Sequence, residues 1–248
     1  MASPYTEFAC DDAARACIEA APQRSPEWLA ARKYRLTASR FASALGHNPF
    51  PGSQREDVVR DMLWGGFTGN VATEWGTAHE ANAVAMYEAY MQTSGSGADF
   101  VVHEHGLMIV PDYPFIGVSP DGIGEHERDG KTVTTLLEVK CPYRWKEDRF
   151  YENHVPLYYW DQIQGIMGFL DIPTCHFVVW TPVGMEINVV AFDAPYFATV
   201  LKPGLLDFYE NLFWPALCAW REGKLTHPNI YPVMQVDVSR GNEHNTQE

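Results

Sequence analysis

The sequence predicts an α/β fold of the mixed α+β type, with a central mixed β-sheet flanked by helices. Two observations carry this prediction. Amphipathic helical patterns fill the first third of the chain, and short apolar or alternating runs begin after the Ser-Gly-Ser-Gly stretch at residues 94–97. With 248 residues and 46% hydrophobic content, the chain has enough apolar material for one large core. We therefore expect a single domain over residues 1–235 and a polar, disordered tail over residues 236–248.

The helical N-terminal part is expected over residues 10–92. Ser25 is a favoured N-cap for one helix, and Thr37 for the next, which Gly46 ends. Ser53 and Glu56 have the spacing of a capping box. The predicted helices cover residues 10–20, 25–32, 39–45, 53–64 and 73–91.

The sheet is expected within residues 100–192. Strands are predicted at residues 100–110, 115–119, 132–140, 176–181 and 185–192, because these runs are apolar or alternate in polarity. A helix over residues 156–170 interrupts them, and helices over residues 195–222 close the chain.

Composition excludes several classes of protein. The apolar runs are far shorter than the roughly 20 residues that a membrane span needs, and the acidic start lacks the layout of a signal peptide. The five cysteines include no C-x-x-C pair, which argues against a disulfide framework, a zinc knuckle or an iron–sulfur cluster. We expect a soluble, intracellular protein with free thiols and no membrane partner.

The formal net charge of −14 opposes binding to a polyanion, but the basic residues are unevenly spread. They form two clusters, whose members are Arg24, Arg32, Lys33, Arg35 and Arg40 in the first, and Lys140, Arg144, Lys146 and Arg149 in the second. Both clusters are equally compatible with a solvated surface and with a local site for nucleic acid.

Four segments direct a polar group toward the predicted core. Asp121 follows an apolar run, and Glu138 and Lys140 share one face of an apolar strand. Glu80 lies on the small, apolar stripe of the long helix, and Gln162 on the core-facing stripe of the helix after Pro156. Such groups are costly to bury unless they are paired or hold a metal ion.

Converging carboxylates repel one another in a site of low dielectric constant unless a divalent cation neutralises them. Oxygen ligands favour Mg²⁺ or Mn²⁺. Lys140 is no ligand, but beside a water activated by the cation it would orient the nucleophile for in-line attack on phosphorus. The pattern therefore indicates hydrolysis of a phosphodiester.

Asp121-Gly122 followed by Glu138-Val139-Lys140 resembles the D…(D/E)-x-K signature of the PD-(D/E)xK nucleases. Further motifs narrow the resemblance to the phage λ exonuclease, or YqaJ-like viral recombinase, branch. They are Ser25-x-Glu27-Trp28, Arg35-Leu36-Thr37-Ala38-Ser39, Gly76-x-x-x-Glu80, Ser119-Pro120-Asp121-Gly122-Ile123, Leu137 to Pro142, and Tyr159-x-x-Gln162-x-Gln164. The similarity covers Ser25 to Pro182 and implies a restriction-endonuclease-like core.

The resemblance also implies roles for individual residues. Asp121, Glu138, Glu80 and the Val139 carbonyl would bind two Mg²⁺ ions, or Mn²⁺ in their place. Lys140 would position the water, with help from Gln162. The residues of the pocket for a terminal 5′-phosphate would be Arg35, Ser39 and Ser119, with Tyr159 in the site wall.

By the same resemblance, the chain would be a Mg²⁺-dependent exodeoxyribonuclease that degrades one strand of linear duplex DNA in the 5′-to-3′ direction. The 3′ overhang would pass to a single-strand-annealing protein in viral-type recombination, in the cytoplasm or nucleus of a host cell. Ring-shaped homotrimers occur in this family. A related PD-(D/E)xK endonuclease, a DNA-processing nuclease and a non-catalytic DNA-end-binding scaffold stay open as alternatives.

Two minor features favour structural roles. His103 and His105 share a strand face without a clear third zinc ligand, so an edge-strand surface is the preferred interpretation. Trp28, Trp145 and Trp160 are expected in the core more than on stacked bases.

Overall fold

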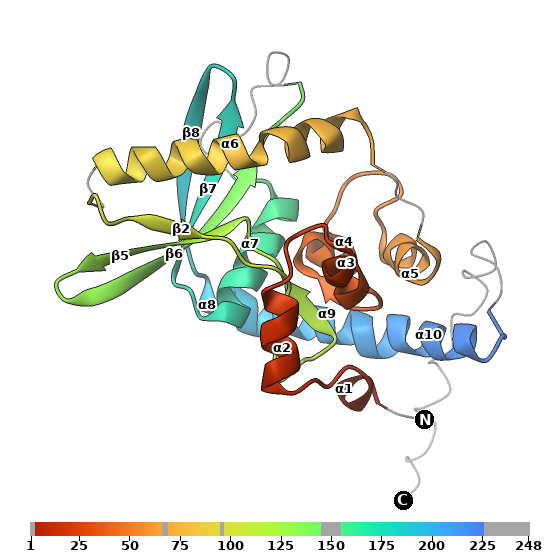
Figure 1. Ribbon diagram of the computed structural model, residues 1–248. Helices are drawn as coiled ribbons and strands as arrows, with labels where there is room; N and C mark the ends of the chain where they lie inside the picture. The colour runs from red at the N-terminus through yellow and green to blue at the C-terminus, as the bar shows by residue number, and fades with distance from the viewer. Residues whose placement is uncertain (1–2, 66–68, 95–96, 145–154, 226–248) are drawn as a thin grey trace, which may run out of the picture.

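Two β-sheets form the centre of the molecule in the computed structural model, which describes residues 3–65, 69–94, 97–144 and 155–225 (Figure 1). The larger sheet has the order β2-β5-β6-β7-β8, with bounds Val101–His103, Gly122–Arg128, Lys131–Lys140, Thr174–Thr181 and Gly184–Ala191. Within it β6 and β7 are parallel, and the other neighbours are antiparallel. The smaller sheet, β1-β4-β3, consists of Leu36–Thr37, Ile116–Val118 and Met108–Ile109. The mixed α/β class is as predicted.

Helices precede, interrupt and follow these strands. The N-terminal ones are α1 (Pro4–Glu7), α2 (Asp12–Glu19), α3 (Pro26–Arg32), η1 (Ala38–Arg40), α4 (Phe41–Leu45), α5 (Arg55–Trp64) and α6 (Val71–Thr93). Helix α7 (Leu157–Leu170) lies between β6 and β7 in sequence. The C-terminal run comprises α8 (Ala194–Tyr196), η2 (Phe197–Leu201), α9 (Lys202–Asp207), η3 (Phe208–Phe213) and α10 (Trp214–Arg221), where η2 and η3 are π-helical.

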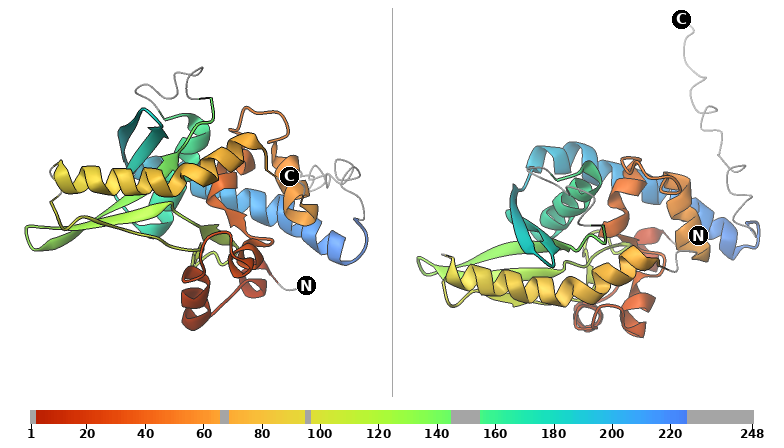
Figure 2. Two further views of the ribbon diagram at one scale, coloured as in Figure 1. Left: turned by 45° about the horizontal axis from the view of Figure 1, so that its top comes forward. Right: turned by 90° about the horizontal axis from the view of Figure 1, so that it is seen from above.

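The larger sheet lies between α6 and α7, as the view from above shows (Figure 2). Alternation along β6 produces this arrangement, because successive side chains point to opposite faces. Leu137 and Val139 pack with Tyr87 of α6, whereas Leu136 belongs to the cluster that contains Ile163 of α7. Glu138 is therefore on the α7 side of the sheet.

A close contact with α4 fixes the position of α7. A Cβ atom at Gly165 would lie 2.4 Å from the Phe41 ring, so only glycine permits this approach. The same helix carries Gln162 toward β6, so this packing also positions a site residue. Within the described ranges, no helix has the length and apolar character needed to cross a membrane.

Three local predictions were wrong. The strand expected at residues 100–110 is divided into β2 and β3, which belong to different sheets. Residues 122–128, for which no strand was predicted, form β5. Helix α5 begins after Gln54 and not Ser53. Thr37 is the N-cap residue of η1, as predicted, but its side chain makes no capping hydrogen bond. The tail over residues 236–248 lies outside the described residues.

Candidate active site

The carboxyl end of β6 and the start of β5 bring two of the predicted acidic residues together. Asp121 directly precedes β5, and its Oδ2 accepts a hydrogen bond of 2.7 Å from the Val139 backbone N–H. The antiparallel register that opposes Gly122 to Leu137 places Asp121 beside the Glu138-Val139-Lys140 segment. A single strand pair therefore sets the spacing of these groups.

Glu138 is the buried centre of this network, with 1% of its side chain exposed. Its Oε1 accepts hydrogen bonds from Lys140 Nζ and, at 2.6 Å, from Gln162 Nε2. Lys140 Nζ also lies 4.9 Å from the centroid of the Tyr159 ring, which makes Tyr159 part of the site wall. The structure thus brings Glu138, Lys140, Gln162 and Tyr159 into one cluster.

Burial and neighbouring charges shift the pKa values of Asp121 and Lys140. Burial raises the pKa of Asp121 well above its ordinary value, and the neighbouring carboxylates of Glu138 and Glu80 raise it further, against the opposing effect of Lys140. Burial lowers the pKa of Lys140, but Glu138 and Asp121 overcome this effect, so the net pKa is raised and Lys140 is protonated. A protonated lysine can orient a water molecule but cannot act as a base.

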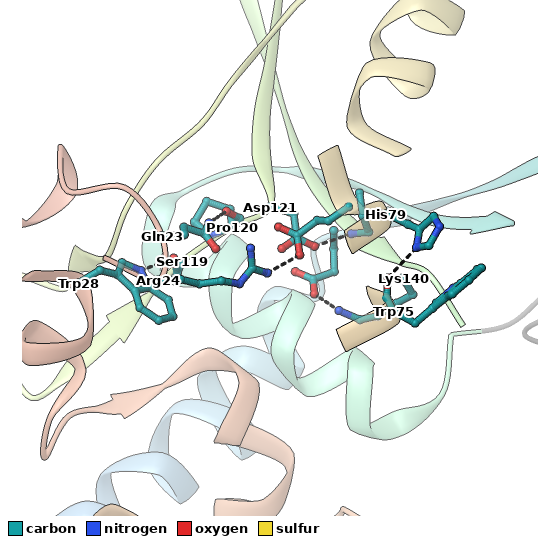
Figure 3. Close-up of polar contacts among 12 residues, drawn as sticks. Gln23, Arg24, Trp28, Trp75, His79, Ser119, Pro120, Asp121 and Lys140 are labelled. Atoms are coloured by element: carbon teal, nitrogen blue, oxygen red, sulfur yellow. Dashed lines mark hydrogen bonds and ion pairs between the residues drawn. The ribbon is translucent and has the colours of Figure 1, made fainter. Parts of the chain in front are cut away.

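Glu80 approaches the same site from α6. It lines a cavity of about 350 Å³ together with Asp121, Arg24 and His105. Its Oε2 accepts a hydrogen bond of 2.8 Å from Arg24, whose side chain reaches toward the carboxylates beside Asp121 (Figure 3). Glu80 is therefore near Asp121 but paired with an arginine.

The donor set fits a hydrated divalent cation. Glu138 Oε2 is buried without a hydrogen-bond partner, an unusual state for a carboxylate oxygen and one that a cation would relieve. Among the residues that the structure describes, no three His, Cys, Asp or Glu side chains are close enough to hold a metal ion by themselves. Mg²⁺ suits such a site, because it keeps several waters and takes few protein carboxylates.

Ser119 belongs to a second polar cluster, which is separate from the cluster around Glu138. Its Oγ donates to the Gly106 carbonyl at 2.8 Å and accepts from Trp28 Nε1 at 3.2 Å. The guanidinium of Arg32 stacks on the Trp28 ring, with Cζ 4.1 Å from the centroid, and donates to Thr37 Oγ1. Burial, then the charge of Arg40, lowers the pKa of Arg32 to about 10, so the group is still cationic at neutral pH.

Arg35 occupies a different environment from the one predicted. Its guanidinium donates to the backbone carbonyls of Pro114, Ala31 and Phe8, at 2.8, 2.6 and 3.3 Å. These contacts hold the end of α1 and helix α3 against the segment before β4, and they engage all three guanidinium nitrogens. Ser39 is exposed in η1.

Sequence reasoning missed the contacts that Arg32 and Arg24 make. Arg32 follows Trp28 by four residues on α3, the spacing at which helical side chains meet, so this pair was detectable. Arg24 gave no such signal, because its contact with Glu80 joins residues 56 positions apart.

Aromatic side chains border the opposite side of the site. Trp75 and His79 of α6 lie with ring centroids 3.8 Å apart, and His79 stacks on Trp180 of β7 at 5.3 Å. Figure 3 shows Trp75 and His79 across the carboxylates from Trp28 and Ser119. Trp160 packs against the main core, as expected. Trp145, Lys146 and Arg149 lie outside the described residues.

Several known proteins are similar to this chain. Residues 27–170 match the YqaJ-like viral recombinase domain. Protein D345L of African swine fever virus is 29% identical over 162 residues, which are 58% of this chain and 45% of that protein. Uncharacterized protein R354 of Acanthamoeba polyphaga mimivirus is 26% identical over 165 residues, 63% of this chain and 28% of the relative. The chain thus spans less than half the length of these curated relatives.

Solved structures show the same fold. The alkaline exonuclease LHK-Exo from Laribacter hongkongensis superposes with a TM-score of 0.63 at 24% identity, covering 80% of this chain and 98% of that one. A phage-related exonuclease from Haemophilus somnus gives a TM-score of 0.51 at 12% identity, covering 72% and 94%. The core is therefore restriction-endonuclease-like, as the resemblance implied. Because the matched domain covers more than half of the chain, this protein belongs to the YqaJ-like viral recombinase family of the PD-(D/E)xK superfamily.

Proposed function

We propose that this chain is a Mg²⁺-dependent 5′-to-3′ exodeoxyribonuclease that acts on linear duplex DNA. The single observation that carries this proposal is the buried, unpartnered Oε2 of Glu138 beside the crowded carboxylate of Asp121. Membership of a viral recombinase family and the fold shared with exonucleases point in the same direction. Mn²⁺ is the expected substitute ion, because it accepts the same oxygen ligands.

Each residue has a defined task in this proposal. Asp121 and Glu138 would hold a first cation with the Val139 carbonyl, and Glu80 would complete the site of a second. Bound divalent ions would lower the pKa of a coordinated water and neutralise charge on the scissile phosphate. Lys140 would orient the attacking water through its ammonium protons. Gln162 would hold the Glu138 carboxylate in position to bind the cation and to contact Lys140.

The 5′ polarity would come from the cluster around Ser119. Arg32 presents a guanidinium whose planar donors match phosphate oxygens, and the Ser119 hydroxyl accepts a hydrogen bond from the indole N–H of the same Trp28. We propose Arg32, in preference to Arg35, as the cation of the terminal-phosphate pocket, since Arg35 is bound to three carbonyls. Ser39 would join the pocket from η1.

End-labelled substrates test this activity. Linear duplexes with 5′-phosphate ends should be degraded in Mg²⁺, duplexes with 5′-hydroxyl ends more slowly, and closed circles not at all. The remaining strand should carry a 3′ overhang suited to a single-strand-annealing partner. Cleavage of closed circles would instead identify an endonuclease, and end binding without cleavage would identify a scaffold.

A further inference from the structure

We infer that Arg24 competes with a divalent cation for Glu80, and so controls how readily a second ion binds. This inference rests on the proposed function, because it assigns Glu80 to that second ion. The guanidinium of Arg24 and the Oε2 of Glu80 are 2.8 Å apart, and the side chains are 49% and 26% exposed. A positive group thus occupies one oxygen of the carboxylate that a cation needs.

The backbone of Arg24 is held in a conformation that side chains disfavour. Its φ angle is 68°, in the left-handed region that glycine adopts without strain. Adjacent contacts maintain this geometry, since Gln23 Nε2 donates to the Pro120 carbonyl at 2.9 Å and to the His105 carbonyl at 3.2 Å. Pro120 directly precedes Asp121, so the loop that carries Arg24 is fastened to the segment that carries a metal ligand.

Space and charge near Arg24 favour an incoming cation. The cavity of about 350 Å³ beside Arg24 is lined by Glu80, Asp121, Glu104 and Glu19, with His105 bound to Glu19. A hydrated divalent ion entering this cavity would be attracted by the carboxylates and repelled by the guanidinium. Binding of the ion to Glu80 should therefore weaken the Arg24 contact, and the released guanidinium would be available to a phosphate oxygen of the substrate.

The test is titration of the full chain with Mn²⁺, in the absence of DNA, followed by calorimetry and by electron paramagnetic resonance of free Mn²⁺. Arg24→Gln should tighten the weaker binding event about twofold to fivefold, the effect of removing one partly exposed ion pair. Arg24→Gly should do the same, because glycine tolerates the left-handed backbone. Thermal melting in EDTA checks that both variants are folded.

Two controls separate this effect from a change of net charge. Arg15→Gln removes the same charge from a surface pair with Asp12 and should leave Mn²⁺ binding unchanged. Glu80→Gln should abolish the weaker event, and Arg24→Gln should have no further effect in that background.

The outcomes distinguish this inference from the proposed function. Equal or weaker Mn²⁺ binding by Arg24→Gln, beside normal two-ion binding by the wild type, would overturn the role of Arg24 alone. If the wild type binds no divalent ion and cleaves no DNA, the metal-dependent function itself fails.

Discussion

Lys140 lies between the buried carboxylate of Glu138 and the face of the Tyr159 ring, so its ammonium group is fixed from two sides. Its raised pKa, caused by the nearby carboxylates of Glu138 and Asp121, keeps it protonated at neutral pH. An ammonium held in this way can direct a water molecule toward phosphorus, and its loss leaves the carboxylates intact.

Lys140→Ala should therefore lower the cleavage rate by about a hundredfold to ten-thousandfold, the range for loss of a positioned proton donor or acceptor. Binding to duplex ends in Ca²⁺ should change little. Lys131→Ala, at the exposed start of the same strand, is the matched control. Normal cleavage by Lys140→Ala would exclude this lysine from the chemistry.

Substitution of Arg32, the last residue of α3, and of Arg35, which directly precedes β1, should have different effects. Arg32→Gln should reduce the preference for 5′-phosphate over 5′-hydroxyl ends about tenfold to a hundredfold, the effect of a lost charge-assisted hydrogen bond. Arg35→Gln should mainly lower the melting temperature, because three buried carbonyls lose their donor. Initial rates on the two duplexes and thermal melts separate these effects. The reverse pattern would restore Arg35 to the phosphate pocket.

Among the secondary-structure elements, α7 connects the hydrophobic core with the candidate active site, since one face of the helix packs on α4 and another presents Gln162 to Glu138. Gly165→Ala should destabilise the fold by about 1–3 kcal/mol, because the added Cβ would overlap the Phe41 ring. Gly76→Ala in α6 is the control, since open space surrounds that position. It should be neutral or slightly stabilising in urea unfolding. Equal stability of both variants would show that α7 can shift away from α4.

Most helices and the strands β4, β6, β7 and β8 were predictable from the sequence, whereas strand β5 and specific contacts were not. The Ser25 cap of α3 and the apolar periodicity of α6 and α7 are local signals, so these helices were predicted within a few residues of their bounds. Strand β5 carries Glu125, His126 and Glu127 and looks like a loop until it pairs with β6. Asp121, Glu138 and Lys140 were recognisable as a motif, but the choice between Arg32 and Arg35 depends on the path of the chain after α3.

At the scale of the whole molecule, one hydrophobic cluster joins α1, α4, α7 and the C-terminal helices, and we propose that these segments form one domain. With a net charge of −14, the proposed DNA substrate would have to bind to a limited surface, and the side of the site that bears Arg24 and Arg32 is suited to it. We propose a homotrimeric ring, which a measurement of molecular mass in solution would test, and a single-strand-annealing partner, which copurification would test.

Acid should weaken the fold through His176. Burial lowers the pKa of His176 below its ordinary 6.5, and its Nδ1 shares a hydrogen bond of 2.8 Å with the Tyr87 hydroxyl. The unfolded chain binds a proton more readily than the folded one, so the contribution to stability is present above about pH 6.5 and is lost as pH falls below it. His176→Gln should flatten the fall in unfolding free energy between pH 7 and 5. Parallel pH curves for variant and wild type would contradict this linkage.

Nucleotide release from a linear, 5′-phosphorylated duplex, measured with and without Mg²⁺ for wild type and Glu138→Gln, tests the central claim most directly. The wild type should degrade the duplex only with Mg²⁺, leaving a 3′ overhang, and Glu138→Gln should be inactive although folded by thermal melting. Cleavage by the wild type in EDTA, or undiminished cleavage by Glu138→Gln in Mg²⁺, would contradict a metal site at Glu138.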